Sequence, residues 1–234
     1  SPIPCEAMEI SSVCTHDIPG WTVGIDGFCE KPEVGTHFGK NVFNYAVIEI
    51  HWNNPMETPA LTDGSGITIF YTDNMRKYDR GRLLLGQNSL AIPPNVDTHY
   101  ESGVCTSDCT GTLAKPIYLY SALLHMHYLG RGGQVEHWRN GKLMKVLVDS
   151  DDYSYDSPVS YPIDPPVVLQ PGDELKMNCK FKTKTKNDIT FFGESTSDEM
   201  CLAFLAYYPK TNFGTCISFG ALDWCVDKEG DMRA

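Results

Sequence analysis

The sequence has no long apolar run and no excess of positive charge. Hydrophobic residues make up 41% of its 234 residues. No segment approaches the roughly 18 consecutive apolar residues of a transmembrane helix, so no membrane span is expected. Aspartate and glutamate number 30 against 19 lysines and arginines, which gives a net charge of −11. Because nothing would neutralise phosphates in bulk, nucleic acid is not expected as a partner.

The cysteines contain no C-x-x-C pair, which argues against a zinc ribbon or a thioredoxin-type redox site. Nine cysteines are many for a protein of the reducing cytosol. We therefore expect a disulfide-bonded protein of the secretory pathway or the extracellular space. The odd number leaves at least one cysteine without a partner in the chain.

Helical signals are also missing, since no segment of ten or more residues follows a helical period and no internal repeat is found. β-branched and aromatic runs lie at 44–54 and 65–73, and others follow between 115 and 209. "RNGK" (139–142) predicts a hairpin, because Asn-Gly adopts the positive φ angles of a tight turn. "LQPGDEL" (169–175) predicts a turn into a further strand. Many short strands separated by turns predict an all-β sandwich or barrel.

The composition changes at two places along the chain. Residues 1–36 are rich in glycine, proline and cysteine, and residues 73–100 join two strand-rich regions. We therefore divide the chain into an N-terminal part at 1–72, a β domain at 73–216 and a C-terminal tail at 217–234.

The stretch "YLYSALLHMHYLGRG" (118–132) places His125 and His127 two residues apart in an apolar run. In a strand these side chains point to one side and Met126 to the other, which can put two imidazoles on one metal ion. Copper(I), being soft, accepts a methionine thioether from elsewhere in the chain as a further ligand. The alternative is that both are ordinary histidines of a β protein. The remaining histidines are isolated, which is typical of structural or exposed residues: His16, His37, His51, His99 and His137.

Four stretches of the chain carry a specific resemblance. They are "IEIHWNNP" (48–55) followed by "GSGITIFYT" (64–72), "GVCTSDCT" (103–110), "LLHMHYLGR" (123–131) and "FGESTSDEMCLAFLAYYP" (192–209). In this order they resemble the motifs of the copper type II ascorbate-dependent monooxygenase family. The match is to the branch of dopamine β-monooxygenase and its monooxygenase-like relatives, which is related to peptidylglycine α-hydroxylating monooxygenase.

The resemblance implies an antiparallel, jelly-roll-like β-sandwich preceded by the closing strands of a second, incomplete sandwich. It places the family's catalytic, substrate-side copper on His125, His127 and Met200, where a substrate C–H bond is attacked. It places His51 among the ligands of a second, electron-transfer copper. Copper is therefore the expected cofactor and ascorbate the expected reductant.

The resemblance also implies disulfide pairs. The family pattern implies Cys105–Cys216 and Cys179–Cys201. It also pairs Cys109 with a cysteine near the C terminus, which in this sequence is best matched by Cys225. Cys201 directly follows Met200, so its disulfide would anchor the backbone of that ligand. The pairing of the three remaining cysteines stays open: Cys5, Cys14 and Cys29.

One part of the family pattern is missing. The second copper needs an adjacent His-His pair well upstream of His51, and this sequence contains no His-His. One copper site is then complete and the other incomplete, unless a missing N-terminal segment or a second chain supplies the ligands; a homo-oligomer also stays open. Alternatively, the chain is a single-domain relative that keeps only the substrate-side copper, or a module that has lost its copper chemistry.

The residues expected near the substrate differ from those of the peptide-amidating branch. That branch has an arginine at the position of Leu123, and an asparagine and a tyrosine at those of Leu202 and Phe204. An apolar lining cannot hold a carboxylate, so a peptide C terminus is not expected as the substrate. Acidic residues of the neighbouring loop are interpreted mainly as solvated side chains: Glu194, Asp198 and Glu199.

We therefore expect a copper-dependent monooxygenase that uses O2 and ascorbate to hydroxylate a C–H bond of a small, apolar or aromatic, amine-like substrate. The alternative is a non-catalytic secreted copper-binding or matrix protein that interacts through the same fold. Only the enzyme would consume O2 with ascorbate and a substrate, and it would lose this activity when Met200 is replaced by isoleucine.

Overall fold

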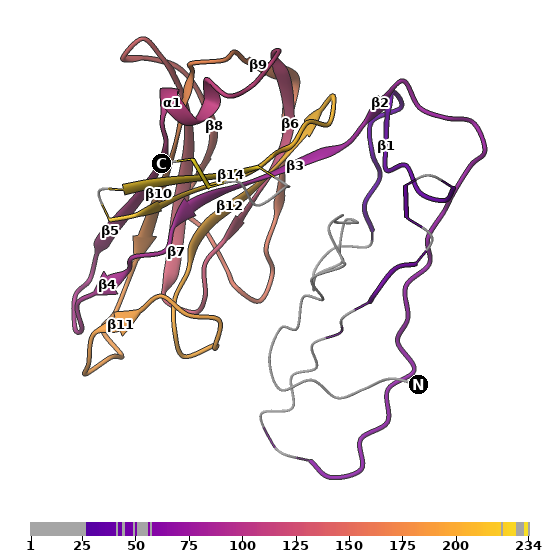
Figure 1. Ribbon diagram of the computed structural model, residues 1–234. Helices are drawn as coiled ribbons and strands as arrows, with labels where there is room; N and C mark the ends of the chain where they lie inside the picture. Colours follow the sequence, from indigo (N-terminus) through magenta and orange to yellow (C-terminus); the bar gives the residue numbers. More distant parts are fainter. Residues whose placement is uncertain are drawn as a thin grey trace.

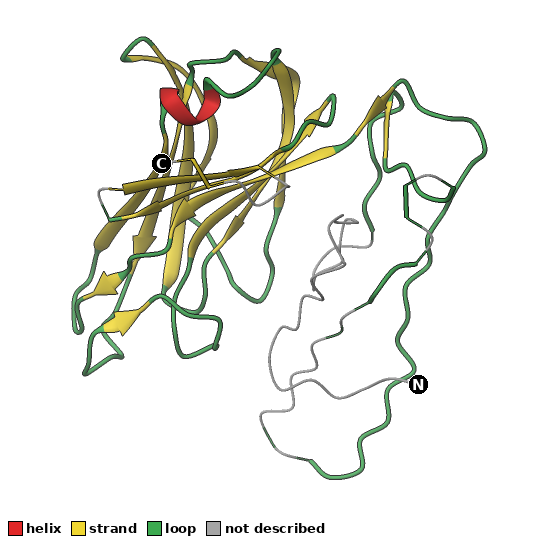
Figure 2. Ribbon diagram, in the orientation of Figure 1, coloured by secondary structure: helices red, strands yellow, loops and turns green. Residues whose placement is uncertain are grey.

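The computed structural model describes residues 27–40, 42–43, 45–48, 50, 56, 58–220, 222–227 and 232–233. Figures 1 and 2 show two β-sheets packed face to face, with a long, mostly irregular segment leading into them. This architecture confirms the predicted all-β sandwich. No helix in the described part of the chain is long and apolar enough to cross a membrane.

The larger sheet has seven strands, and all neighbours in it are antiparallel except β3 and β13. In spatial order they are β15 (Met232–Arg233), β14 (Leu222–Asp227), β13 (Phe213–Phe219), β3 (Gly81–Gln87), β12 (Cys201–Tyr208), β6 (Ile117–His125) and β9 (Ser160–Leu169). The segment 217–234, predicted as a tail, thus contributes the end of β13, strand β14 and the edge strand β15 to this sheet.

The smaller sheet has four antiparallel strands. In spatial order they are β5 (His99–Cys105), β10 (Glu174–Phe181), β7 (Gly130–Arg139) and β8 (Lys142–Ser150). The predicted hairpin joins β7 to β8, with positive φ angles of 51° at Asn140 and 70° at Gly141. The predicted turn before β10 contains Gly172 with a φ angle of 87°. Both turn predictions are confirmed.

Short elements complete the described structure. They are the parallel pair β1 (Val34–Gly35) and β2 (Tyr78–Asp79), the antiparallel pair β4 (Ala91–Ile92) and β11 (Thr190–Phe191), and helix α1 (Ser107–Thr110). Thr106 caps α1, because its side chain accepts a hydrogen bond from the backbone N–H of Cys109.

The core lies between the inner faces of the two sheets. Strand β10 shows the pattern clearly, since Leu175, Met177 and Phe181 are fully buried and alternate with more exposed residues. The lysines of β10 lie on its other face, as alternation of side chains along a strand requires. Most of the buried apolar residues thus form one main cluster between the sheets.

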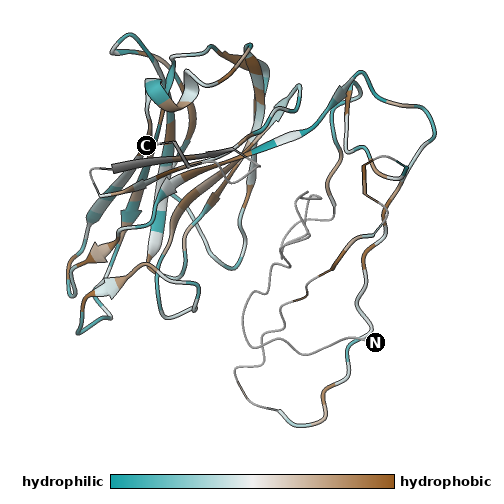
Figure 3. Ribbon diagram, in the orientation of Figure 1, coloured by the Kyte–Doolittle hydropathy of each residue, from teal (hydrophilic) through white to brown (hydrophobic). Residues whose placement is uncertain are grey.

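The strand expected at 65–73 is not present. Residues 65–73 are irregular, and so are the described residues of the other predicted run, 45–48 and 50. A strand requires hydrogen bonds from a neighbouring strand, and the described chain offers none beside these residues. Figure 3 shows hydrophobic residues both in the sandwich and in the long segment before β2. Their β-forming composition is therefore present without sheet structure.

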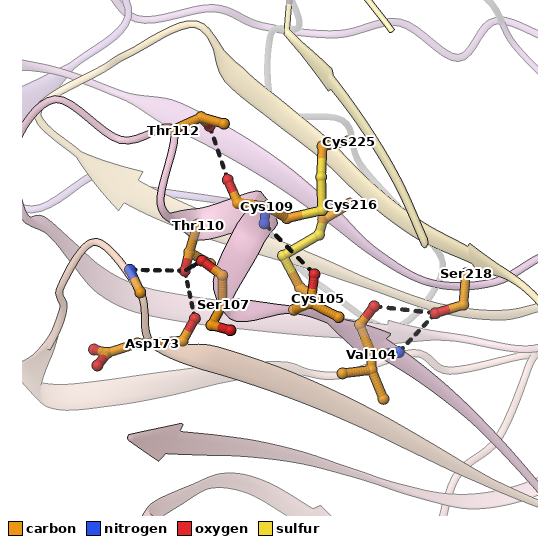
Figure 4. The surroundings of a disulfide bond; sticks show 12 residues. Val104, Cys105, Ser107, Cys109, Thr110, Thr112, Asp173, Cys216, Ser218 and Cys225 are labelled. Carbon is orange, nitrogen blue, oxygen red and sulfur yellow. Dashed lines mark hydrogen bonds between the residues drawn. A yellow bond between two sulfur atoms is a disulfide. The ribbon is translucent and has the colours of Figure 1, made fainter. Parts of the chain in front are cut away.

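Three disulfides connect described residues. Cys105–Cys216 joins β5 to β13 and Cys179–Cys201 joins β10 to β12, so both cross from one sheet to the other. Cys109–Cys225 joins α1 to β14, beside Cys105–Cys216 (Figure 4). These are the pairs that the resemblance implies. Cys29 is exposed and bonds to no other described cysteine.

The sulfur atoms of Cys105, Cys109 and Cys216 lie within 4.8 Å of one another. All three are in disulfides, as Figure 4 shows, whereas a metal ion is bound by free thiolates. This cluster is therefore a structural staple and not a metal site.

Candidate metal centre

His125 and His127 lie at the end of β6 and in the turn that follows it. Their ring centroids are 5.4 Å apart and the ring planes cross at 88°. Met126 between them is fully buried in the core, as the alternation of a strand predicts. The two imidazoles are thus close neighbours on the side of the sheet away from the core.

The ring of His127 is held in one orientation. Its Nδ1 lies 3.1 Å from the backbone carbonyl oxygen of Asp198, and because a carbonyl only accepts, Nδ1–H is the donor. In the neutral imidazole, this hydrogen bond leaves the lone pair on Nε2, the nitrogen that could then bind a metal. His127 itself is only 3% exposed.

Met200 lies just before β12, the strand that pairs with β6. The last pair of their antiparallel ladder joins Leu202 to His125, and continuing the register by two residues sets Met200 opposite His127. Met200 is 7% exposed and packs in an apolar cluster with Leu202 and Ile217. Two segments far apart in the sequence thus run side by side, and the backbone of Met200 lies on the segment next to the one that carries His125 and His127.

Glu199 connects these two segments. Its Oε2 accepts hydrogen bonds from the backbone N–H of His127 at 2.7 Å and of Met200 at 3.0 Å. Its Oε1 accepts one from Leu129 N–H at 2.6 Å. Burial raises the pKa of the Glu199 carboxyl, while these backbone hydrogen bonds act in the opposite direction.

The interpretation of Glu199 as a solvated residue is wrong. Its side chain is fully buried, whereas Glu194 is exposed and Asp198 is half-buried. A loop rich in serine and acidic residues normally faces water, and nothing in its composition separates Glu199 from its neighbours. The position directly before Met200 was the one available signal.

Tyr153 holds the residue between the histidines. Its hydroxyl donates to the carbonyl oxygen of Met126 at 2.6 Å and accepts from the N–H of Met126 at 3.0 Å. Burial raises the pKa of Tyr153 to about 12, so the hydroxyl stays protonated. Tyr155, two residues later, places its ring 5.5 Å from that of His127.

An apolar surface adjoins His125. The ring of Phe204 on β12 lies 6.0 Å from the His125 ring, and Leu123 lies opposite Phe204 in the register. The guanidinium of Arg82, on the neighbouring strand β3, lies 5.3 Å from the centroid of the same Phe204 ring. This face therefore offers aromatic and aliphatic contacts next to the candidate centre.

The donor set fits copper. Burial, with the neighbouring His127, lowers the pKa of His125 to about 4, so His125 is neutral at physiological pH, as a metal ligand must be. Two imidazoles and a thioether suit a soft ion such as copper(I). His51, predicted as a ligand of the second copper, lies outside the described residues.

The other isolated histidines of the sandwich have structural partners. His99 contacts Glu101 at 2.8 Å, and buried His137 contacts buried Asp173 at 2.8 Å. Neither lies in the candidate centre, which agrees with their interpretation as structural residues.

The comparison with protein families gives a direct match. Residues 78–226 match the family model described as "Copper type II ascorbate-dependent monooxygenase, C-terminal domain". The chain belongs to this family. The family is copper-dependent and ascorbate-dependent, and the matched range contains both sheets and the candidate centre.

Curated relatives agree with this assignment. The chain is 34% identical to DBH-like monooxygenase protein 2 of Mus musculus over 94% of its own length and 37% of that protein. It is 36% identical to DBH-like monooxygenase protein 1 of Homo sapiens, covering 88% of the chain and 35% of that protein. Dopamine beta-hydroxylase of Canis lupus familiaris is 32% identical over 91% of the chain and 35% of that protein. The chain thus spans little more than a third of these relatives.

Proposed function

We propose that this chain provides the substrate-side copper centre of a monooxygenase that hydroxylates a C–H bond with O2 and ascorbate. His125, His127 and Met200 are the proposed ligands, and copper bound there would supply the redox chemistry that lets dioxygen attack the C–H bond. The observation that carries the proposal is the junction at Glu199, which holds the backbones of His127 and Met200 side by side.

Residues around the proposed ligands orient them and shield them from water. The Asp198 carbonyl orients the ring of His127 so that Nε2 is available to copper. The apolar cluster around Met200 keeps water away from its thioether and leaves that soft ligand to the metal.

The surface beside His125 supports a small apolar or aromatic substrate. Phe204 and Leu123 can pack against a ring or an alkyl chain next to the centre. Buried Glu199 is fully engaged by backbone N–H groups, so it does not serve as the partner of a substrate amine. Glu194 is exposed, and we propose it as the acidic residue that could bind the amino group of an amine-like substrate.

We further propose that residues 40–72 form strands when another segment or a second chain supplies the remaining strands and ligands of the electron-transfer copper. Several large apolar side chains in this range are exposed, among them Tyr45 at 92%, Phe70 at 91% and Ile69 at 52%. Exposed β-branched and aromatic residues in such numbers favour a binding partner. The disulfides of the sandwich support a secreted or secretory-granule location.

The first experiment is copper analysis of the reconstituted protein, with the mass of the eluting species recorded. One copper on a single chain of 26.1 kDa supports the centre at His125, His127 and Met200 and shows that the second site needs a partner. Two coppers per chain in a larger species support a partner that supplies the missing ligands. No copper in any species contradicts the proposal.

Met200→Ile tests the thioether. We expect the variant to lose sulfur scattering in the copper X-ray absorption spectrum and to lose ascorbate-dependent O2 consumption, because isoleucine has no donor atom. Met75→Ile is the control, since Met75 is 64% exposed and lies outside the sandwich. Copper binding without any substrate-dependent O2 consumption in the two-copper species would favour the non-catalytic alternative.

A further inference from the structure

Of the three proposed ligands, His125 is the last residue of β6, whereas His127 and Met200 lie on segments that have left the regular sheet. The β6–β12 ladder ends at the pair His125 and Leu202. His127 and Met200 lie beyond that pair, where no ladder hydrogen bond joins the two strands. Something other than the sheet must set the distance between the second imidazole and the thioether.

The Glu199 carboxyl group lies between the two segments at this point and bonds to both. One of its oxygens accepts from the backbone N–H groups of both ligands, His127 and Met200, and the other accepts from Leu129. The side chain is fully buried, so water does not compete for these bonds.

Three other contacts act nearby, and none of them bonds to the backbones of both segments. Tyr153 ties down Met126 in the first segment, and the Cys179–Cys201 disulfide anchors the residue after Met200 in the second. The Asp198 carbonyl joins the segments through the His127 ring, so that contact orients one ligand. Glu199 bonds to the backbones of both.

We propose that Glu199 is a positioning residue of the copper centre, which sets the place of the Met200 thioether relative to the two imidazoles. The inference rests on the proposed function, because it assumes that these three side chains bind copper. Glu199 does not touch the metal or the substrate. It acts by fixing the two backbones from which the ligands extend.

Two substitutions test this role, each in the whole chain. Glu199→Ala removes both acceptor oxygens and with them all three hydrogen bonds. Glu199→Gln keeps the size of the side chain but replaces one acceptor oxygen by an NH2 group, which then faces a backbone N–H donor. The matched control is Asp173→Asn, because Asp173 is also a buried acid that accepts a backbone N–H bond, from Gln170, outside the candidate centre.

Copper(I) affinity by competition with a chelator and the copper–sulfur signal in X-ray absorption are the readouts. Loss of an outer partner of a metal ligand typically costs about 10–100-fold in affinity. We expect a loss of this size and a missing or weakened sulfur signal for Glu199→Ala, and a smaller loss for Glu199→Gln. The copper(I) affinity of Asp173→Asn should stay within about twofold of that of the unmodified protein, even if the variant is less stable.

The outcomes separate the two proposals. Unmodified protein without copper contradicts the proposed function, and this inference with it. Unmodified protein with copper, but unchanged affinity and sulfur signal in both Glu199 variants, overturns only the positioning role. Equal losses in Asp173→Asn and the Glu199 variants would also overturn it, since they would reflect general destabilisation. If Glu199→Ala does not fold, Glu199→Gln decides: weaker copper binding supports the role and unchanged binding overturns it.

Discussion

Tyr153 uses a single hydroxyl group to satisfy both backbone polar groups of Met126, the residue between the two histidines. Met126 is fully buried, so its N–H and C=O have no access to water. A buried backbone group that loses its partner costs the full desolvation penalty of that group. The Tyr153 side chain therefore supports the backbone between the two histidines that are proposed to bind copper.

Tyr153→Phe should lower the free energy of unfolding by about 1–3 kcal/mol, because the two Met126 backbone groups are left without a partner. Denaturant unfolding measures the change. Tyr128→Phe is the control, since the Tyr128 ring is 45% exposed and its hydroxyl bonds to Asp156 at the surface. An equal change in both variants would contradict the role given to Tyr153.

Asp173 is a second buried residue that organises its surroundings. It contacts His137 at 2.8 Å and Arg139 at 2.6 Å, and it accepts a hydrogen bond from Gln170 N–H. Burial by itself would raise the pKa of Asp173, but the hydrogen bonds from Arg139, Gln170 and His137 outweigh it and lower the pKa. The charged carboxylate is thus stabilised in the folded protein.

A carboxyl whose pKa is lower in the folded state than in the unfolded state stabilises the fold above its unfolded pKa, near 3.8. This stability is lost as the pH falls through the folded pKa. Asp173→Asn should therefore be less stable than the unmodified protein at pH 7, and the difference should narrow as the pH falls below about 4. Urea unfolding at a series of pH values measures it, and a difference that is constant with pH would contradict this account.

At the scale of elements, the two sheets come into backbone contact where β5 crosses β3. A Cβ atom added to Gly103 would lie 2.2 Å from the carbonyl oxygen of Gly86. Nearby, the Ser218 hydroxyl of β13 accepts from the N–H of Val104 at 2.8 Å and donates to its carbonyl at 3.0 Å. The sheets can approach this closely only because glycine occupies position 103.

Gly103→Ala should destabilise the protein by about 1–3 kcal/mol or more, since the clashing atoms belong to backbone that cannot rotate away. Thermal or denaturant unfolding reports the change. Gly64→Ala is the control, because no atom lies within 4 Å of the Cβ position there. A Gly103→Ala protein as stable as that control would show that the sheets can separate at little cost.

At the scale of the whole molecule, two disulfides fasten one sheet to the other with different loop lengths. Cys105 and Cys216 are 111 residues apart in sequence, and Cys179 and Cys201 are 22 apart. In the chain-entropy model a longer closed loop stabilises more, by about 1.4 kcal/mol for this pair of lengths. The shorter loop contains the Glu199 and Met200 segment.

Removing each disulfide by double alanine substitution should separate stability from copper binding. Cys105→Ala with Cys216→Ala should lower the free energy of unfolding more than removal of the other disulfide does, within the typical range of about 2–5 kcal/mol. Cys179→Ala with Cys201→Ala should cost less stability but weaken copper(I) binding more, because it frees the backbone next to Met200. The reverse order in either measurement would contradict the assignment.

The structure of the segment before β2 depends on what the rest of the protein places beside it. Glu30 accepts a hydrogen bond from Tyr120 and pairs with Arg80 at 2.9 Å, which attaches the start of the described chain to the sandwich. Residues 65–73 have the composition of a strand and yet are irregular. Composition expresses a preference for strand, but hydrogen-bonding neighbours are needed to realise it.

The sequence by itself determined the β class, the Asn140–Gly141 hairpin and the family, because alternation, turn residues and motif spacing are local properties of the chain. Only the tertiary structure decided the burial of Glu199, the contact at Gly103 and the irregular state of 65–73. Each of these depends on which distant segment lies opposite. A carboxylate beside other acidic residues is interpreted as solvated until the fold places three backbone N–H groups around it.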